Sequence, residues 1–180
     1  MAKYSREELL ETIVETLLER GLGAASLRPL AKAAGTSDRM LLYYFKDKNE
    51  LLQAAFGALA GRLMAQLESA FPEGTTAPPS ELLARLGEIT RGADLKPAMR
   101  LWIELTAAAS RGEEPHGSVG AAILDGFLAW IERRLPADFE GDRPAMAAAI
   151  LAAVDGAAIL DALGREEAAT AALHQLAERL

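Results

Sequence analysis

Side chains that carry out bond-making chemistry are scarce in this 180-residue sequence. It has no cysteine and only two histidines, His116 and His174, which argues against a thiolate zinc site and a multi-histidine metal centre. Glu113 and His116 have the spacing of half a di-iron motif, but they lie in the loop-like segment Arg-Gly-Glu-Glu-Pro-His-Gly and no second pair exists. Phosphate-binding loops and the Gly-x-Ser-x-Gly and His-Glu-x-x-His motifs are also absent from the sequence. We therefore predict that the protein is not an enzyme and has no cofactor or metal.

Charge is distributed unevenly along the chain and indicates a surface for anions. The formal net charge is −7, which argues against indiscriminate coating of nucleic acid. Residues 1–50 nevertheless carry eight basic and eight acidic side chains, whereas residues 51–180 carry eleven basic and eighteen acidic ones. Within residues 26–48 the basic side chains outnumber Asp38 and Asp47; they are Arg28, Lys32, Arg39, Lys46 and Lys48. A local basic patch on an acidic protein is consistent with one anion-binding face.

Two short predicted helices and a tight turn position this basic patch. Ser26 is a good N-cap for the first of them, and Gly35 can take the positive φ that a tight turn needs. The second begins at Ser37 or Asp38 and runs to about Tyr44. Helix, glycine-containing turn and helix form a helix-turn-helix signature, although generic helical hairpins share this spacing.

The rest of the sequence also predicts helices. A capping box at Ser5 and Glu8 opens the first one, whose apolar face ends at a cap candidate, Gly21. No stretch alternates apolar and polar residues as a strand would. The expected later helices cover 47–71, 80–92, 96–111, 117–135, 144–163 and 166–179, with a loop at 72–80. We therefore predict an all-α fold of about nine to ten helices.

The segment 144–163 is apolar and long enough to cross a bilayer. It is rich in alanine rather than leucine, and Asp155 lies in its middle, where a charge is costly in lipid. We expect a helix buried in a protein–protein bundle instead of a membrane span, because small side chains let helices approach closely. Because no apolar signal segment opens the chain and cysteine is absent, a cytoplasmic location is expected.

Residues 9–55 resemble the tetracycline-repressor (TetR) family. The family places Ala-Gly-Val-Ser, Leu-Tyr-Tyr-His-Phe and Lys-x-Lys-Glu-x-Leu where this chain has Ala-Gly-Thr-Ser, Leu-Leu-Tyr-Tyr-Phe and Lys-Asp-Lys-Asn-Glu-Leu-Leu. The chain departs from the pattern at Thr36, Arg39, Met40 and Leu42. The resemblance implies a helix-turn-helix DNA-binding domain over 1–47, with three helices, and a helical effector-binding and dimerisation domain over 48–180.

For the DNA-binding domain, the resemblance implies a recognition helix in the major groove with its N-terminal residues against base edges. Arg39 would bond guanine and Met40 would pack on a thymine methyl group, with Asp38 at the same end. The expected DNA contacts, phosphate contacts included, are Arg28, Thr36, Ser37, Asp38, Arg39, Met40, Tyr43, Tyr44 and Lys48. Leu41 and Phe45 are expected in the core, and we assign no role to Leu42.

Three of these DNA contacts have plainer interpretations. Tyr43 could lie at the edge of the core, and Arg39 could be a solvated surface residue. Lys48 could pair only with Asp47 or Glu50. Because the residues at 39, 40 and 42 differ from the family pattern, no known operator sequence can be transferred.

The larger domain is expected to hold a small apolar effector and to form a homodimer. The expected ligand-lining residues are Met64, Met99, Trp102, Thr106, Phe127 and Trp130, with Glu104 as a further polar group; plain core packing is the alternative. The expected dimer residues on the helices at 117–135 and 144–163 are Ala121, Leu124, Leu128, Ile150, Leu151, Val154 and Ala158; an intrachain core is the alternative.

The function that follows is a ligand-responsive transcriptional repressor. It would bind palindromic double-stranded operator DNA as a homodimer and release it when a small molecule binds. The competing hypothesis is a helical ligand-binding or protein-interaction module without operator-specific DNA binding.

Overall fold

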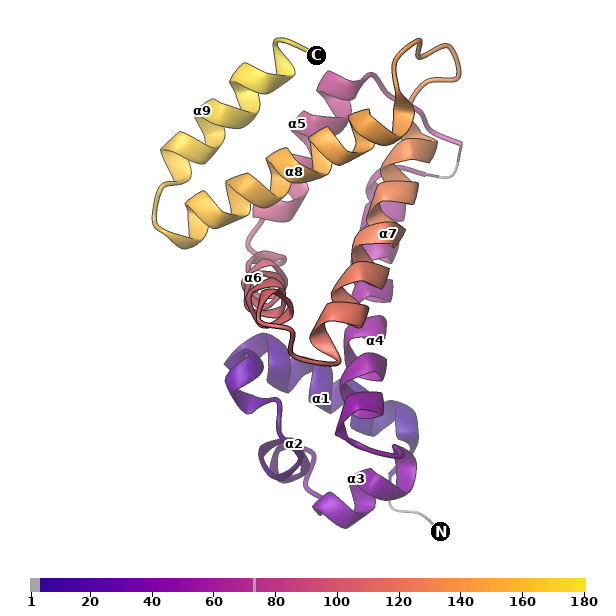
Figure 1. The fold of residues 1–180 in the computed structure, drawn as a ribbon, viewed down its shortest axis with the longest axis vertical. Helices are drawn as coiled ribbons and strands as arrows, with labels where there is room; N and C mark the ends of the chain where they lie inside the picture. The colour runs from indigo at the N-terminus through magenta and orange to yellow at the C-terminus, as the bar shows by residue number, and fades with distance from the viewer. Residues whose placement is uncertain (1–3, 73) are drawn as a thin grey trace. The chain divides into compact units, whose positions relative to one another are not determined.

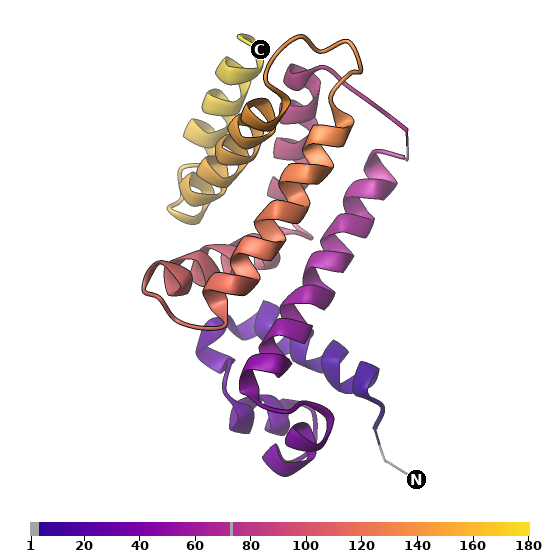
Figure 2. The same ribbon diagram turned by 45° about the vertical axis from the view of Figure 1, so that its right-hand side comes forward.

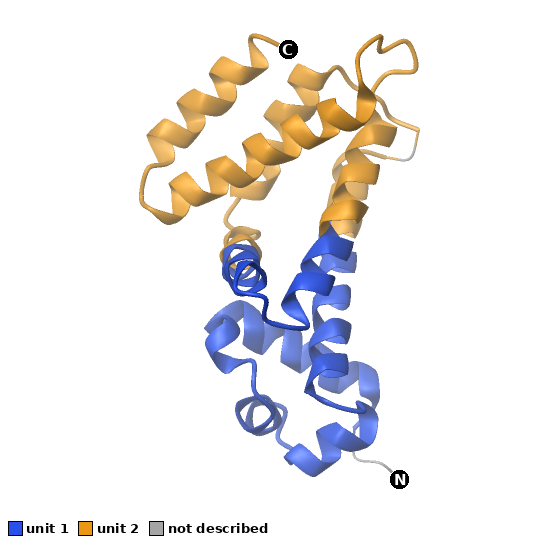
Figure 3. Ribbon diagram, viewed as in Figure 1, with its two compact units in different colours: residues 1–63, 101–123 blue, residues 64–100, 124–180 orange. Residues whose placement is uncertain are grey.

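The structure, a computed structural model, describes residues 4–72 and 74–180. Over these residues the chain forms nine α-helices and one 3₁₀ turn and contains no strand, as the sequence predicts (Figures 1 and 2). The chain folds into two compact units (Figure 3). Unit 1 comprises residues 1–63 and 101–123, and unit 2 comprises residues 64–100 and 124–180.

The division into units follows packing along the chain. It falls inside α4 (Lys48–Ala70), α6 (Lys96–Ser110) and α7 (His116–Arg134), so each of these helices contributes residues to both units. The predicted boundary between a DNA-binding domain (1–47) and an effector-binding domain (48–180) concerns function and not packing. It therefore stays a prediction.

Unit 1 begins with α1 (Arg6–Arg20), which starts at the expected capping box. Ser5 Oγ accepts a hydrogen bond from the Glu8 N–H at 3.1 Å, and the Ser5 N–H donates to the Glu8 carboxylate at 2.8 Å. These two bonds satisfy backbone groups that a helix end otherwise leaves unpaired. The apolar face of α1 is buried through Leu9, Ile13, Val14 and Leu17.

Three short elements follow α1: η1 (Leu22–Ala24), α2 (Leu27–Ala33) and α3 (Asp38–Tyr44). Helix α1 packs against η1 and α2, and α2 packs against α3. The 3₁₀ turn η1 was not predicted from the sequence. Leu30, Leu41, Phe45, Leu51 and Leu52 are all fully buried, so α2, α3 and the first turn of α4 each contribute to the unit's interior.

Unit 2 contains α5 (Pro79–Arg91), α8 (Arg143–Ala162) and α9 (Glu166–Ala177), which pack pairwise against one another. The buried residues of this core include Phe71, Leu82, Trp130, Ile150, Val154 and Leu173. Helix α8 has the length and hydropathy of a membrane span, but a core helix of a soluble protein passes the same test. Its inner face belongs to this core, and the protein–protein bundle expected for residues 144–163 stays a prediction.

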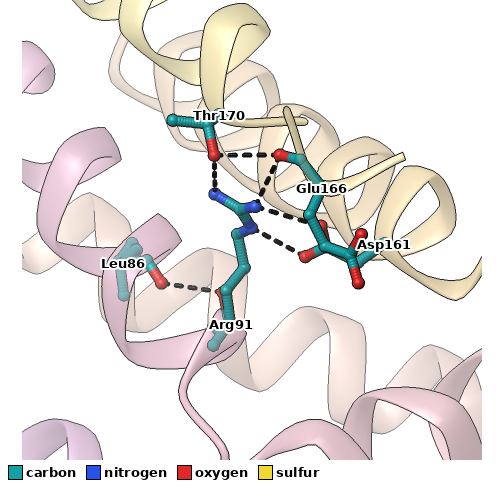
Figure 4. A network of polar contacts seen from close by, with 6 residues as sticks. Leu86, Arg91, Asp161, Glu166 and Thr170 are labelled. Carbon is teal, nitrogen blue, oxygen red and sulfur yellow. Dashed lines mark hydrogen bonds and ion pairs between the residues drawn. The ribbon is translucent and has the colours of Figure 1, made fainter. Parts of the chain in front are cut away.

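Arg91 joins the ends of the three helices of unit 2 (Figure 4). Its guanidinium binds both carboxylate oxygens of Asp161, at 2.7 and 3.0 Å, and donates to Thr170 Oγ1 at 2.9 Å and to the Glu166 carbonyl at 2.9 Å. The hydrogen bond with Asp161 raises the pKa of Arg91 above its ordinary value. One side chain of α5 thereby fixes the α8–α9 turn.

A second arginine is almost completely buried in unit 2. Arg134 forms an ion pair with Glu68 and donates to the Phe71 carbonyl at 2.9 Å. Trp130 donates its indole N–H to the other oxygen of Glu68 at 2.8 Å, and its ring meets Phe71 edge to face. Glu68 therefore accepts from two interior donors, the Trp130 indole and the Arg134 guanidinium. A buried polar group without a partner would destabilise the fold.

Candidate nucleic-acid interface

The outward face of α3 carries four neighbouring exposed side chains. At 100° per residue, positions 38, 39, 42 and 43 fall on one side of a helix. Asp38, Arg39, Leu42 and Tyr43 are all exposed, and Tyr43 and Leu42 keep 76% and 43% of their surface accessible. On the opposite side Leu41 is buried, as is the cap residue Phe45, which confirms the prediction that both belong to the core.

The turn before α3 has the predicted backbone. Gly35 has φ +61°, a conformation that other residues rarely adopt. The sequence left Ser37 and Asp38 as alternative caps, and the structure selects Ser37, whose Oγ accepts from the Met40 N–H at 3.3 Å. Thr36 and Met40 are half-buried at the flanks of the exposed face.

Tyr4 ties the turn to the end of α3. Its hydroxyl donates to the Gly35 carbonyl at 2.9 Å, and its own carbonyl accepts from the Tyr44 hydroxyl at 2.6 Å. The Tyr44 ring also meets Tyr43 edge to face, with centroids 5.1 Å apart. Tyr44 therefore has a positioning task in addition to its predicted phosphate contact. Nothing in the spacing of the sequence indicated this role of Tyr4.

Arg28, predicted to contact a phosphate or a base, and Lys48, predicted to contact a phosphate, are exposed in unit 1. Asp47 caps α4 by accepting from the Glu50 N–H at 2.9 Å, and Glu50 pairs with Arg6 at 3.6 Å. Among the described residues, neither Asp47 nor Glu50 forms an ion pair with Lys48, so the local pairing considered above is not seen.

An acidic side chain lies within electrostatic reach of Lys48. The hydrogen bond from Arg111, at 2.5 Å, lowers the pKa of Glu113, and the charges of Arg111, His116 and Lys48 lower it further. Glu113 is exposed and lies near the start of α7. Its negative charge offsets part of the positive potential that Lys48 would offer to a phosphate.

A carboxylate of α6 is anchored to the loop that follows α1. Glu104 accepts a hydrogen bond from the Leu22 N–H at 2.6 Å. Beside it Gly21 ends α1 with φ +69° and ψ −170°, a region that essentially only glycine adopts. A Cβ at this glycine would lie 2.5 Å from Glu104 Oε1 and 2.8 Å from its Cδ. The glycine thus leaves the space that the carboxylate occupies.

Comparison with known proteins identifies the family of this helix-turn-helix. Residues 9–55 match the family model of bacterial regulatory proteins, tetR family. These residues therefore form a TetR-family DNA-binding region within the chain. A curated relative, the HTH-type transcriptional regulator BetI of Pseudomonas fluorescens, is 26% identical over 118 residues, which cover 64% of this chain and 60% of BetI. The chain therefore spans less than two thirds of the length of this relative.

Solved structures show the same fold along the chain. A transcriptional regulator from Rhodococcus sp. Rha1 has a TM-score of 0.77 and 24% identity, covering 98% of this chain and 95% of that one. The transcriptional regulator FadR from Bacillus subtilis, solved in complex with stearoyl-CoA, has a TM-score of 0.70 and 17% identity, covering 98% and 100%. The matched family model describes regulatory proteins and BetI is named as a transcriptional regulator, in agreement with the prediction that the chain is not an enzyme.

The residues expected to line a TetR-family effector site are spread over both units, and their role stays a prediction. Trp102 and Thr106 belong to unit 1, where Thr106 is exposed and donates to the Ile103 carbonyl at 2.9 Å. In unit 2, Met64, Met99 and Phe127 are half-buried, whereas Trp130 is fully buried with its indole N–H satisfied.

The expected TetR-family dimer residues differ in how much surface they offer. Leu124 and Ala121 are exposed on α7, and Leu128 and Leu151 are half-buried. Ile150, Val154 and Ala158 are buried within the chain. The outer side of α8 instead exposes Ile159 and, just past its end, Leu163, with 50% and 71% of their surface accessible.

Proposed function

We propose that this chain is a ligand-responsive transcriptional regulator that represses by binding palindromic operator DNA as a homodimer. The observation that supports this most is the exposed face of α3, on a helix held in place by a buried Leu41 and a serine cap. Arg39, at the N-terminal end of this face, would bind guanine through two hydrogen bonds. A protein that binds operator DNA must be located with that DNA, so the proposed function agrees with the cytoplasmic location expected from the sequence.

Selection from random duplex DNA with the purified, ligand-free protein tests this proposal. An enriched palindrome with two half-sites about one helical turn apart supports a dimeric, sequence-reading regulator. Arg39→Ala should then weaken binding by about 1–3 kcal/mol and relax the preference at one base pair of each half-site. No enriched site with or without effector would favour the competing hypothesis of a helical module that does not read DNA.

The homodimer is proposed to form through apolar surface on α7 and α8. Only 28% of the most apolar window of α8 is buried within the chain, and TetR-family regulators act as dimers. A second copy would cover such an apolar face. Sedimentation should show a dimer for the natural chain and a larger monomer fraction for Leu124→Asp, which adds charge on an exposed position. A natural chain that sediments as a monomer at micromolar concentration would contradict the dimer.

The effector is proposed to be a small apolar molecule whose binding releases the DNA. The support is the half-buried Met64, Met99 and Phe127 of this chain. FadR, which shares the fold, was solved with stearoyl-CoA, a molecule with a long apolar acyl chain. A ligand shifts such an equilibrium only by its difference in affinity between the two states. A screen of apolar compounds for loss of operator binding, with Phe127→Ala as the variant expected to lose the response, tests this part.

A further inference from the structure

Leu42 is one of the inner residues of the exposed face of α3. On a helix it lies three residues from Arg39 and four from Asp38, so these side chains are neighbours on one surface. Leu42 keeps 43% of its surface accessible to solvent, whereas its neighbour Leu41 is fully buried. The family pattern has a tyrosine here, whose hydroxyl can bind phosphate, and leucine has no polar group for that purpose.

We infer that Leu42 reads the C5-methyl group of a thymine in the operator. This inference rests on the proposed function. The major groove of B-DNA is wide enough for an α-helix, and the thymine methyl group is its distinctive apolar feature. An exposed leucine beside an arginine that binds guanine would bury apolar surface against that methyl group, which is favourable in proportion to the area removed from water.

The exposure pattern favours Leu42 over Met40 for this contact. Met40 is half-buried, and it lies outside the outward arc that positions 38, 39, 42 and 43 define. Leu42 lies between Asp38 and Arg39 in that arc, and Leu42 and Arg39 are its two inner positions. A half-site read by Arg39 and Leu42 would therefore contain a guanine and a thymine close together.

Deoxyuridine tests the inference because it differs from thymidine only by the missing methyl group. Operators from the selection experiment are prepared as a series. In each member, one pair of symmetric thymidines is replaced by deoxyuridine, and the affinity is measured by gel shift. We expect one position in each half-site where the replacement weakens binding about three- to tenfold. Leu42→Ala should bind the natural operator correspondingly more weakly and should lose the sensitivity at that position.

Two variants keep the test specific. Leu42→Met retains an apolar side chain and should keep most of the methyl sensitivity. Met40→Ala, at another expected DNA contact, should change overall affinity but leave the ratio between the thymidine and deoxyuridine operators at this position unchanged. Alanine is the best helix former and position 42 is exposed, so Leu42→Ala is expected to fold. Circular dichroism verifies that it does.

The outcomes separate this inference from the proposed function. An enriched operator with no methyl-sensitive position, or with a sensitivity that survives in Leu42→Ala, overturns the inference and leaves the regulator intact. A sensitivity that disappears in Met40→Ala instead assigns the contact to Met40 and also overturns it. Absence of any enriched operator overturns the proposed function and this inference with it.

Discussion

Replacing Gly21 with alanine should destabilise unit 1 strongly, because one methyl group disturbs two interactions. The backbone at this residue, with φ +69° and ψ −170°, costs about 1–3 kcal/mol for a residue with a Cβ. The new Cβ would also lie 2.5 Å from Glu104 Oε1, which forces the carboxylate away from the Leu22 N–H. A hydrogen bond to a charged group contributes about 1.5–3 kcal/mol. The expected loss in the free energy of unfolding is therefore about 2.5–6 kcal/mol.

A double-mutant cycle separates the two terms. Glu104→Ala alone should cost about 1.5–3 kcal/mol because the Leu22 N–H loses its partner. In the Glu104→Ala background, Gly21→Ala should cost only the backbone term of about 1–3 kcal/mol, since the carboxylate is already gone. The double variant should thus be more stable than the two single losses predict when added.

Urea denaturation of the full chain, followed by circular dichroism, measures these differences. Gly23→Ala is the matched control, because its φ is not positive and a Cβ there would have no atom within 4 Å. It should change stability by less than about 1 kcal/mol. Losses for Gly21→Ala and Glu104→Ala that add within about 0.5 kcal/mol would refute the reasoning, because independent sites behave in that way.

Three further changes have defined expected outcomes. Lys48→Ala should weaken binding to all duplex sequences about equally and lower the slope of log K against log salt by about one, as gel shifts over a salt series would show; an unchanged slope rejects the phosphate contact. Glu113→Gln removes the negative charge near Lys48, so operator affinity at low salt should rise about two- to threefold and the gain should fade as salt increases; equal gains at all salt concentrations would argue against this electrostatic cause. Arg91→Ala should lower the free energy of unfolding, measured by urea denaturation, by about 2–4 kcal/mol because Asp161 and the Glu166 carbonyl lose their donor. Arg111→Ala, which breaks an exposed ion pair, should cost less than about 1 kcal/mol. Similar losses for the two variants would contradict the structural importance of Arg91.

The elements of the fold could be predicted because their signals are local. The capping box at Ser5 and Glu8 lies within four residues, and the positive φ of Gly35 follows from its place between two amphipathic segments. The buried positions of Leu41 and Phe45 follow from the same periodicity. Periodicity also gives the outward arc of α3, so most of the candidate interface was accessible from the sequence.

The contacts that hold the interface together were not accessible, because they join distant residues. Tyr4 bonds Gly35 and Tyr44 across 31 and 40 positions, and Glu104 bonds Leu22 across 82. The sequence indicated Glu104 only as a polar group for an effector. It also could not decide whether Trp130 lined a ligand site or filled a core, since both need an apolar side chain on an inward face; the structure buries this indole and satisfies its N–H.

The two tryptophans of the chain make each unit visible to spectroscopy. Trp102 belongs to unit 1 and Trp130 to unit 2, and the sequence contains no others. Trp130 lies in an apolar core, so its emission should be blue-shifted in the folded protein and should move to longer wavelength when that core opens to water. Replacing one tryptophan at a time with phenylalanine would give two single-reporter proteins. Intrinsic fluorescence could then follow the unfolding of unit 1 and of unit 2 separately, without an attached dye.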